Sequence, residues 1–396
     1  LYARILGTGV EQNDAFRVDL AVTGTGALSG TDASVAAVQG QTTTAKDGAL
    51  VVSRDASTPN AAIVDDSGTV KTYSLKFEAQ NDNYVISELS LELNGTDSSA
   101  AANVILKDGG TILATRPGAE VAGPAVADIV FSGLQIPVNA NTTKVLDVEV
   151  EVAPVGYGAG TSGAEITVDF IDAVVQIGST GELGTVGTGV TDNTVIGNSI
   201  YVYKAIPTIS LVNLPTTALG PGERTLSKFT IATNGTGTVA WKKIMVDVTK
   251  SSTGAAGPTF NTNTVKLYNA DTGQEITSAV TANDDCNDQN KTACTIILAV
   301  GTNTDDNVEE VISGSKTYEI RATIGGTIAT GDYITTQIKH SDCTHATGAA
   351  YLTVSGNNAT FVWSDQSAQS HDTGTSDWMN DNLVKNLSLT SQTLTK

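Results

Sequence analysis

The side chains best suited to chemistry are few, and they lie mostly in the last third of the chain. Cys286 and Cys294 bracket the segment CNDQNKTAC between two strand-like stretches. We predict a disulfide between them, which would place the chain in an oxidising compartment. His340, Cys343 and His345 are residue types that bind Zn or Cu. Their spacing matches no familiar zinc module, so a polar loop is the preferred interpretation, with Cys343 buried or bonded to another chain.

The densest acidic cluster surrounds the predicted disulfide loop. It consists of Asp284, Asp285, Asp288, Asp305 and Asp306. Ca²⁺ takes six to eight oxygen ligands, and its best-known loop spaces Asp residues two apart. That spacing is absent here. The first interpretation is therefore a solvated acidic loop, and the second is a structural Ca²⁺ site.

Catalytic motifs are missing from the chain. Neither G-x-S-x-G nor H-E-x-x-H occurs, and no Gly-Thr-Gly run continues into the Gly-Lys-Ser/Thr of a phosphate loop. We predict no enzyme and no cofactor, although a hydrolase with paired carboxylates would need no motif. Trp241, Trp363 and Trp378 could form a sugar platform, but core packing or an interface is the preferred use for each.

The composition favours an all-β protein that avoids phosphates. Apolar residues make up 40 % of the 396 residues but aromatic ones only 5 %, and Gly and Thr are abundant. The net charge of −20 and the pI near 4.4 argue against nucleic acid and anionic lipid as partners. No run of eighteen apolar residues occurs, so we predict no membrane span.

Asn-x-Ser/Thr triplets fit a secreted, glycosylated surface. A chain this rich in Asn and Thr carries several by chance, so these sites are candidates only. They are Asn94, Asn141, Asn234, Asn290, Asn358 and Asn386.

A repeated pattern of strands organises the chain. In the segment 71–95, apolar and polar residues alternate, first around Phe77 and then through Leu89, Leu91 and Leu93. Period two is typical of half-buried strands. The segment 224–250 repeats this pattern, and the alternating segment 146–152 has a counterpart at 318–324. We therefore expect two units with the same strand order.

The repeat predicts the domain boundaries. Residues 1–48 form a partial β unit, 49–199 and 200–360 are two complete sandwiches, and 361–396 form an extended tail, which either closes the second unit or reaches outward to another molecule. The first residues match the end of the repeat: Leu1, Ala3 and Ile5 align with 148–152, and 16–20 aligns with 166–170. We therefore expect the chain to open two strands before a unit closes, and a two-stranded ribbon is marginal in water.

The chain resembles the Ig-like repeat proteins of prokaryotic cell surfaces, which include S-layer, adhesin and surface-filament proteins. The resemblance rests on the two repeated units and on the tail that carries Trp363 and Trp378. It implies an all-β fold of tandem immunoglobulin-like β-sandwiches, an extracellular location, self-association and no catalysis.

The incomplete first unit suggests how copies associate. We expect the tail of one copy to add strands to the open ribbon of the next, so that contacts run head to tail and need not close. The interface would comprise Leu1, Ala3, Ile5, Phe16, Val18, Leu20, Leu383, Leu387, Leu389 and Leu394. The alternative is an adhesin or carbohydrate-binding module whose partners are cell-surface glycans.

Overall fold

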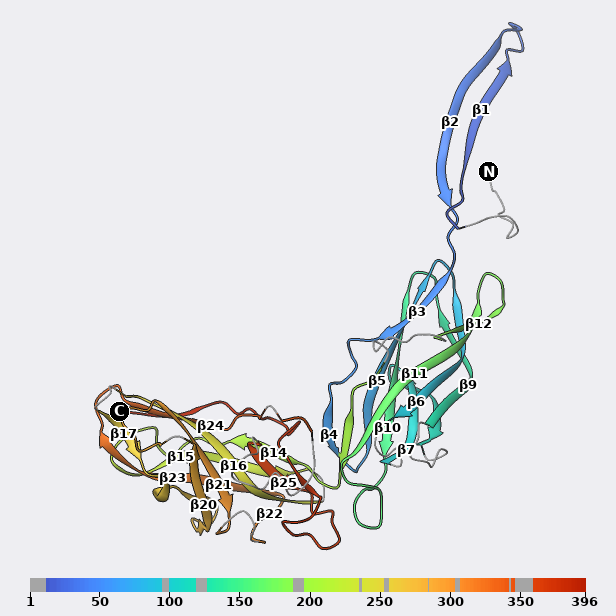
Figure 1. Cartoon of the computed structure of the whole chain (residues 1–396). Helices are drawn as coiled ribbons and strands as arrows, with labels where there is room; N and C mark the ends of the chain where they lie inside the picture. Colours follow the sequence, from blue (N-terminus) through green and yellow to red (C-terminus); the bar gives the residue numbers. More distant parts are fainter. Residues whose placement is uncertain are drawn as a thin grey trace.

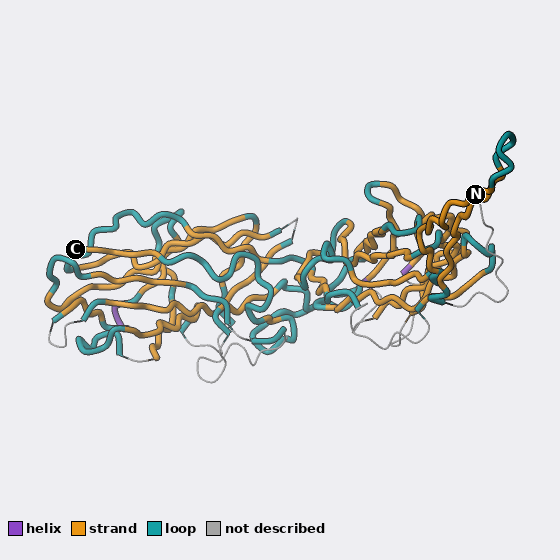
Figure 2. The backbone as a smooth tube through the Cα atoms, turned by 90° about the horizontal axis from the view of Figure 1, so that it is seen from above, coloured by secondary structure: helices purple, strands orange, loops and turns teal. Residues whose placement is uncertain are grey.

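The computed structural model confirms the all-β class and the tandem β-sandwich architecture (Figures 1 and 2). It describes residues 12–94, 100–118, 127–187, 196–234, 237–252, 256–283, 285–302, 307–341, 343–345 and 359–396. In those ranges the helical structure consists of single 3₁₀ turns such as Thr262–Thr264. None of the described helices is long and apolar enough to cross a membrane.

The described part of the chain begins with a hairpin that projects from the first sandwich (Figure 1). Strands β1 (Ala15–Thr25) and β2 (Asp32–Thr44) pair antiparallel and form a sheet of their own. A short turn joins them, in which Gly30 has φ +63° and the Gly26 amide donates to the Thr31 carbonyl at 2.9 Å. Glycine tolerates this left-handed conformation without the steric cost of a Cβ.

The first sandwich consists of two sheets around one apolar core. One sheet has the order β3 (Ala49–Arg54), β5 (Thr69–Gln80), β10 (Thr143–Val152), β7 (Ala101–Asp108) and β8 (Thr111–Pro117). The other has β4 (Ala62–Asp65), β13 (Ile200–Tyr203), β11 (Ala164–Ile177), β6 (Tyr84–Asn94) and β9 (Ala127–Val138), with β12 (Leu183–Val186) beside β11. The alternating residues of 71–95 supply its centre, since Phe77, Leu89 and Leu91 are fully buried.

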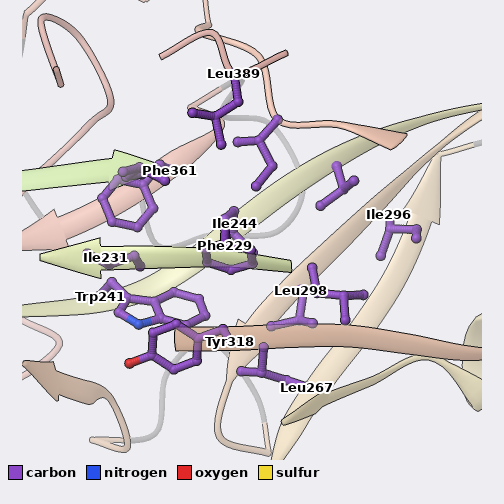
Figure 3. Packing of buried hydrophobic residues seen from close by; sticks show 14 of the residues in the cluster. Phe229, Ile231, Trp241, Ile244, Leu267, Ile296, Leu298, Tyr318, Phe361 and Leu389 are labelled. Atoms are coloured by element: carbon purple, nitrogen blue, oxygen red, sulfur yellow. The ribbon is translucent and has the colours of Figure 1, made fainter. Parts of the chain in front are cut away.

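The second sandwich also has two sheets. The first contains β14 (Pro207–Leu211), β15 (Gly222–Thr233), β23 (Ser315–Thr327), β18 (Lys266–Asn269) and β19 (Glu275–Ile276), with β17 (Gly257–Phe260) beside β23. The second contains β20 (Ser278–Asn283), β21 (Ala293–Val300), β16 (Thr238–Lys250), β24 (Tyr333–Gln337) and β27 (Gln392–Thr395). Strands β22 (Glu310–Ser313) and β25 (Phe361–Ser364) also pair with β16, and β26 (Trp378–Met379) pairs with β25. Phe229, Trp241 and Tyr318 pack edge-on and stacked in the core (Figure 3).

The predicted repeat of strand order is present in the structure. Strand β5 pairs with β10 in the first sandwich, and the equivalent β15 pairs with β23 in the second. Likewise β6 pairs with β11, and β16 pairs with β24. One boundary differs, because β13 at 200–203 pairs with β4 and β11 and so belongs to the first sandwich.

The structure shows the first of the two roles predicted for the C-terminal segment, closure of the second sandwich, and not the second, in which the segment reaches outward to another copy. Strand β27 pairs with β24 of its own chain, so that Leu394 lies opposite Ile334. Leu389 and Leu394 are buried, and Leu383 and Leu387 pack against the same core. Burial of these leucines completes the second sandwich. The segment therefore cannot be donated to a neighbour without opening its own sandwich.

Candidate assembly interface and other predicted sites

The hairpin exposes one apolar face. Alternation places Phe16, Val18, Leu20 and Val22 on the same side of β1, and the cross-strand partners of the last two are Val38 and Val35. Val18 is 47 % exposed, Leu20 55 % and Val22 53 %, while Val35 and Val38 are 62 % and 65 % exposed. We call these six residues, Phe16, Val18, Leu20, Val22, Val35 and Val38, the hairpin face.

The hairpin face is unusual because nothing in the described structure forms a second layer over it. Apolar residues scattered singly on a surface are normal, whereas a contiguous strip of them marks an interaction site. A two-stranded ribbon alone is marginally stable at best. The predicted strand at Leu1, Ala3 and Ile5 lies outside the described residues, and β1 pairs with β2 in the structure.

Cys286 and Cys294 form the predicted disulfide. Their Cα atoms lie 5.4 Å apart, and both side chains are buried against the second core. Cys294 lies near the start of β21, opposite Val248 of β16, so the bridge anchors the loop 285–293 to this end of the strand. Cys343, by contrast, is a free cysteine of intermediate exposure.

The described residues of the acidic loop show no set of ligands that faces a common point. Asp285 accepts a hydrogen bond from the Asn287 amide at 2.8 Å. Asp288 accepts two bonds from Asn290, which lower the pKa of its carboxyl group. Asp284, Asp305 and Asp306 lie outside the described residues. Among the residues described, no group of three or more His, Cys, Asp or Glu side chains is placed to hold a metal ion, and a Ca²⁺ site stays a prediction.

The glycosylation candidates differ in accessibility. Asn141, Asn234, Asn290 and Asn386 are exposed. Asn94 is half-buried at the end of β6, where its amide donates to Glu92 and Asp169. Asn358 lies outside the described residues. The exposed sites meet the first requirement for modification.

The tryptophans do not form a sugar platform. Trp241, Trp363 and Trp378 are each at most 1 % exposed. The indole N–H of Trp363 donates to the Asn380 carbonyl, and that of Trp378 to the Asp372 carbonyl. Core packing, the preferred interpretation, is what the structure shows for all three.

Two of the three histidines, His345 and His371, make separate side-chain contacts. His345 stacks on the Tyr201 ring with centroids 3.7 Å apart, and its Nε2 bonds the Tyr203 hydroxyl. Burial lowers the pKa of His345. His371 lies between Glu309 and Asp377, at 2.8 Å from each. Sequence spacing could not reveal this second contact, because Glu309 is 62 residues away from His371.

The two sandwiches meet at a polar junction that the sequence did not indicate. Asp365 is fully buried there. One of its carboxylate oxygens accepts hydrogen bonds from the Ser162 hydroxyl and from the Lys204 amide, the latter at 3.0 Å. Beside it, the Tyr157 amide donates to the Ser367 carbonyl at 3.1 Å. A loop of the first sandwich is thus tied to the strand end of β25 in the second.

A cavity of about 370 Å³ lies between this loop and the segment after β25. Tyr157, 70 % exposed, stands among its lining residues, together with hydroxyl and amide side chains. These include Thr161, Ser162, Ser367, Gln369 and Ser376.

Comparison with known proteins gives structural likenesses only. No protein-family model matches the sequence, and no curated protein matches it. The C-terminal domain of the antigen I/II-family protein AspA of Streptococcus pyogenes is 9 % identical, with a TM-score of 0.22 over 73 % of this chain and 94 % of that one. The T6 backbone pilin of serotype M6 Streptococcus pyogenes is 10 % identical, with a TM-score of 0.22 over 80 % and 64 % of the two chains. A Pleurotus ostreatus lectin in complex with GalNAc is 12 % identical, with a TM-score of 0.17 over 79 % and 85 %. At such TM-scores, the function has to be argued from the chain itself.

Proposed function

We propose that this chain is a secreted structural subunit that assembles head to tail into an extracellular filament or surface layer. Copies of the chain are its partners, and the contact is β-strand complementation of the hairpin by the next copy. The exposed hairpin face carries this proposal. Because the C-terminal segment is already part of its own sandwich, the hairpin takes the role of the connecting element.

The position of the hairpin face supports a specific contact. Its residues span 16–22 of β1 and 35–38 of β2, so they cover roughly 20 Å by 10 Å, or about 200 Å², on one side of the ribbon. A contiguous apolar strip of this kind, with no second layer over it in the described structure, is a candidate interaction site. Covering this face and adding a ladder of main-chain hydrogen bonds would stabilise both the hairpin and the contact.

Two further features fit an extracellular structural role. The buried disulfide between Cys286 and Cys294 persists in oxidising compartments. The hairpin and the second sandwich lie at opposite ends of an elongated chain (Figure 1). A contact between opposite ends is heterologous, and such contacts build open filaments when the rotation does not close a ring.

Electron micrographs of the purified full chain test the proposal. We expect filaments or lattices from the natural sequence, and monomers from the triple variant Val18→Thr, Leu20→Thr, Val22→Thr. Thr keeps the strand preference but removes the apolar surface. A control variant, Asp19→Asn, Ala21→Ser, Thr23→Ser, changes the opposite side of β1 and should assemble normally. Equal assembly of all three proteins would refute the proposal.

The junction cavity favours a second candidate function, glycan binding by an adhesin or carbohydrate-binding module. Tyr157 offers an exposed ring beside several hydroxyl and amide groups, and binding sites combine apolar contact with a few placed polar groups. Glycan-array binding that is lost in Tyr157→Ala but kept in Tyr333→Ala, a change at another exposed tyrosine, would support this function. Absence of binding to any glycan would dismiss it.

A further inference from the structure

Strand β20 is an open edge of the second sandwich. Within the described structure it pairs with β21 alone. Its sequence, SAVTAN, has no charged residue and no proline. Natural proteins protect sheet edges with charges, prolines, bulges or covering loops, because an unprotected edge can pair with another chain. Along its six residues β20 has no charge, no proline and no register shift, and the turn Thr262–Thr264 lies close to it.

Most other described edges longer than two residues are protected. The protecting residues are Arg116 and Pro117 in β8, Pro137 and Gly133 (φ +75°) in β9, Pro207 in β14 and Pro258 in β17. The edge of β27 is covered by the segment Thr217–Leu219. β4, β12 and β22 have only four residues each. β3 begins directly after the hairpin, so the base of the hairpin lies at one end of its edge, and β3 ends in the charged residue Arg54. β20 is therefore the best acceptor among them.

The backbone of β20 presents its free groups outward at known positions. The Gly301 amide donates to the Thr277 carbonyl at 2.8 Å, which makes this a hydrogen-bonded pair. Bonded and non-bonded pairs alternate in an antiparallel ladder. The amides of Ser278, Val280 and Ala282 therefore point away from β21, toward the open edge.

The inner side of this edge is apolar. Val280 and Ala282 are partly buried against the second core, and so is Ile276 of β19 in the facing sheet. These three residues form a partly covered seam between the edges of the two sheets. A strand added beside β20 would extend the inner surface over this seam, provided that its own inner side is apolar.

Strand β1 has the regularity that such an added strand needs. The two register shifts of the hairpin fall between Arg17 and Asp19 and between Leu20 and Val22, and in both the extra residue lies in β2. Bulges bend a strand and interrupt pairing. β1 is thus the regular strand of the pair, and its apolar side belongs to the hairpin face.

We infer that β20 is the acceptor strand for β1 of the next copy, so that the hairpin face continues the inner surface formed by Val280 and Ala282. This inference rests on the proposed function and names the surface that it uses. The chain's own hairpin lies at the far end of the molecule (Figure 1), so the pairing joins two copies. It adds two strands to the sheet β20-β21-β16-β24-β27.

The variant Val280→Pro tests the inference. It removes an outward amide and no bond of the chain's own ladder, and proline is tolerated at such edge positions. We expect the fraction pelleted by centrifugation to fall about tenfold or more, the effect of about 1.4 kcal/mol per contact.

The control is Val52→Pro in β3. Because the Asp55 amide donates to the Ser74 carbonyl, the same alternation turns the Val52 amide outward. This control should assemble like the natural chain.

A second measurement identifies the partner strand, and a second variant is used if the first does not fold. A photo-crosslinking amino acid in place of Thr281 should link to the segment 15–25 of another copy; linkage only to other segments would overturn the inference. If Val280→Pro does not fold by circular dichroism, Ala282→Lys replaces it. If the β20 variant assembles normally and the hairpin-face variant does not assemble, the inference is rejected and the proposed function still stands. Normal assembly of both would reject the two together.

Discussion

His371 Nε2 lies 2.8 Å from Glu309 Oε2, and this contact ties the loop between β25 and β26 to the start of β22. Asp377 holds the other ring nitrogen at 2.8 Å. Burial alone would lower the pKa of His371, but the hydrogen bonds and charges of Asp377 and Glu309 outweigh burial and raise this pKa to about 9. The imidazole is therefore a cation between two carboxylates in the folded chain.

The His371 contact predicts a loss of stability at alkaline pH. A group whose pKa is higher in the folded state stabilises that state, and the effect is complete at pH values below its unfolded pKa near 6.5. For His371 this contribution disappears as the pH rises through about 9. We expect the free energy of unfolding to fall by on the order of 2 kcal/mol between pH 6.5 and pH 9.5. Denaturant titrations at several pH values measure this, and His371→Gln should lack the slope. An equal slope in both proteins would mean that other groups cause it.

The junction carboxylate predicts coupling between the sandwiches. Asp365→Ala leaves the Lys204 and Ser367 amides without this acceptor, and unmet buried donors cost about 1–3 kcal/mol each. We expect faster proteolysis of the loop 153–163 and a lower unfolding temperature. Ser162→Ala removes one hydroxyl bond and should have a smaller effect, about 1 kcal/mol. If Asp365→Ala behaves like the natural chain, the junction does not hold the loop.

The disulfide predicts a stability change confined to the second sandwich. Replacing both cysteines (Cys286→Ala, Cys294→Ala) removes a cross-link with a sequence separation of 8, which lowers the free energy of unfolding by about 2.5 kcal/mol in the chain-entropy treatment. Calorimetry of the variant should show one transition shifted and the other unchanged. Cys343→Ala is the control that alters a cysteine without a bridge. A shift in both transitions would show that the sandwiches unfold as one unit.

The C-terminal strand predicts that truncation damages folding before it affects assembly. Leu394 is 1 % exposed and lies opposite Ile334, and Leu→Ala at a buried position costs about 2–5 kcal/mol. Leu387→Ala, at a partly buried position, should cost less. Thermal melts of monomeric protein measure both. A Leu394→Ala variant that melts like the natural chain but no longer assembles would restore the tail as the connector.

Local patterns predicted what depends on neighbouring residues. Alternation around Phe77 and through Leu89 to Leu93 indicated strands, and the cysteine spacing indicated a closed loop. The predictions that failed concern pairing between distant segments. Leu394 pairs with Ile334, about sixty residues away, and nothing in the segment around Leu394 tells whether its partner belongs to the same chain. The contact of His371 with Glu309 has the same character.

The sequence predicted one of the two strands of the hairpin, for a related reason. Alternation placed Phe16, Val18 and Leu20 on one face, and that face is exposed. The partner strand β2 was missed because its bulges and its Ala- and Thr-rich sequence blur the period of two.

Hydrogen exchange of the hairpin amides tests the central claim most directly. The segment 15–44 should exchange rapidly in monomers at low concentration, because a two-stranded ribbon opens easily. In assembled material of the natural chain, the amides of β1 should become strongly protected as β1 pairs with a second copy and the hairpin face is covered. Equally rapid exchange of this segment in monomers and in assemblies would contradict the account.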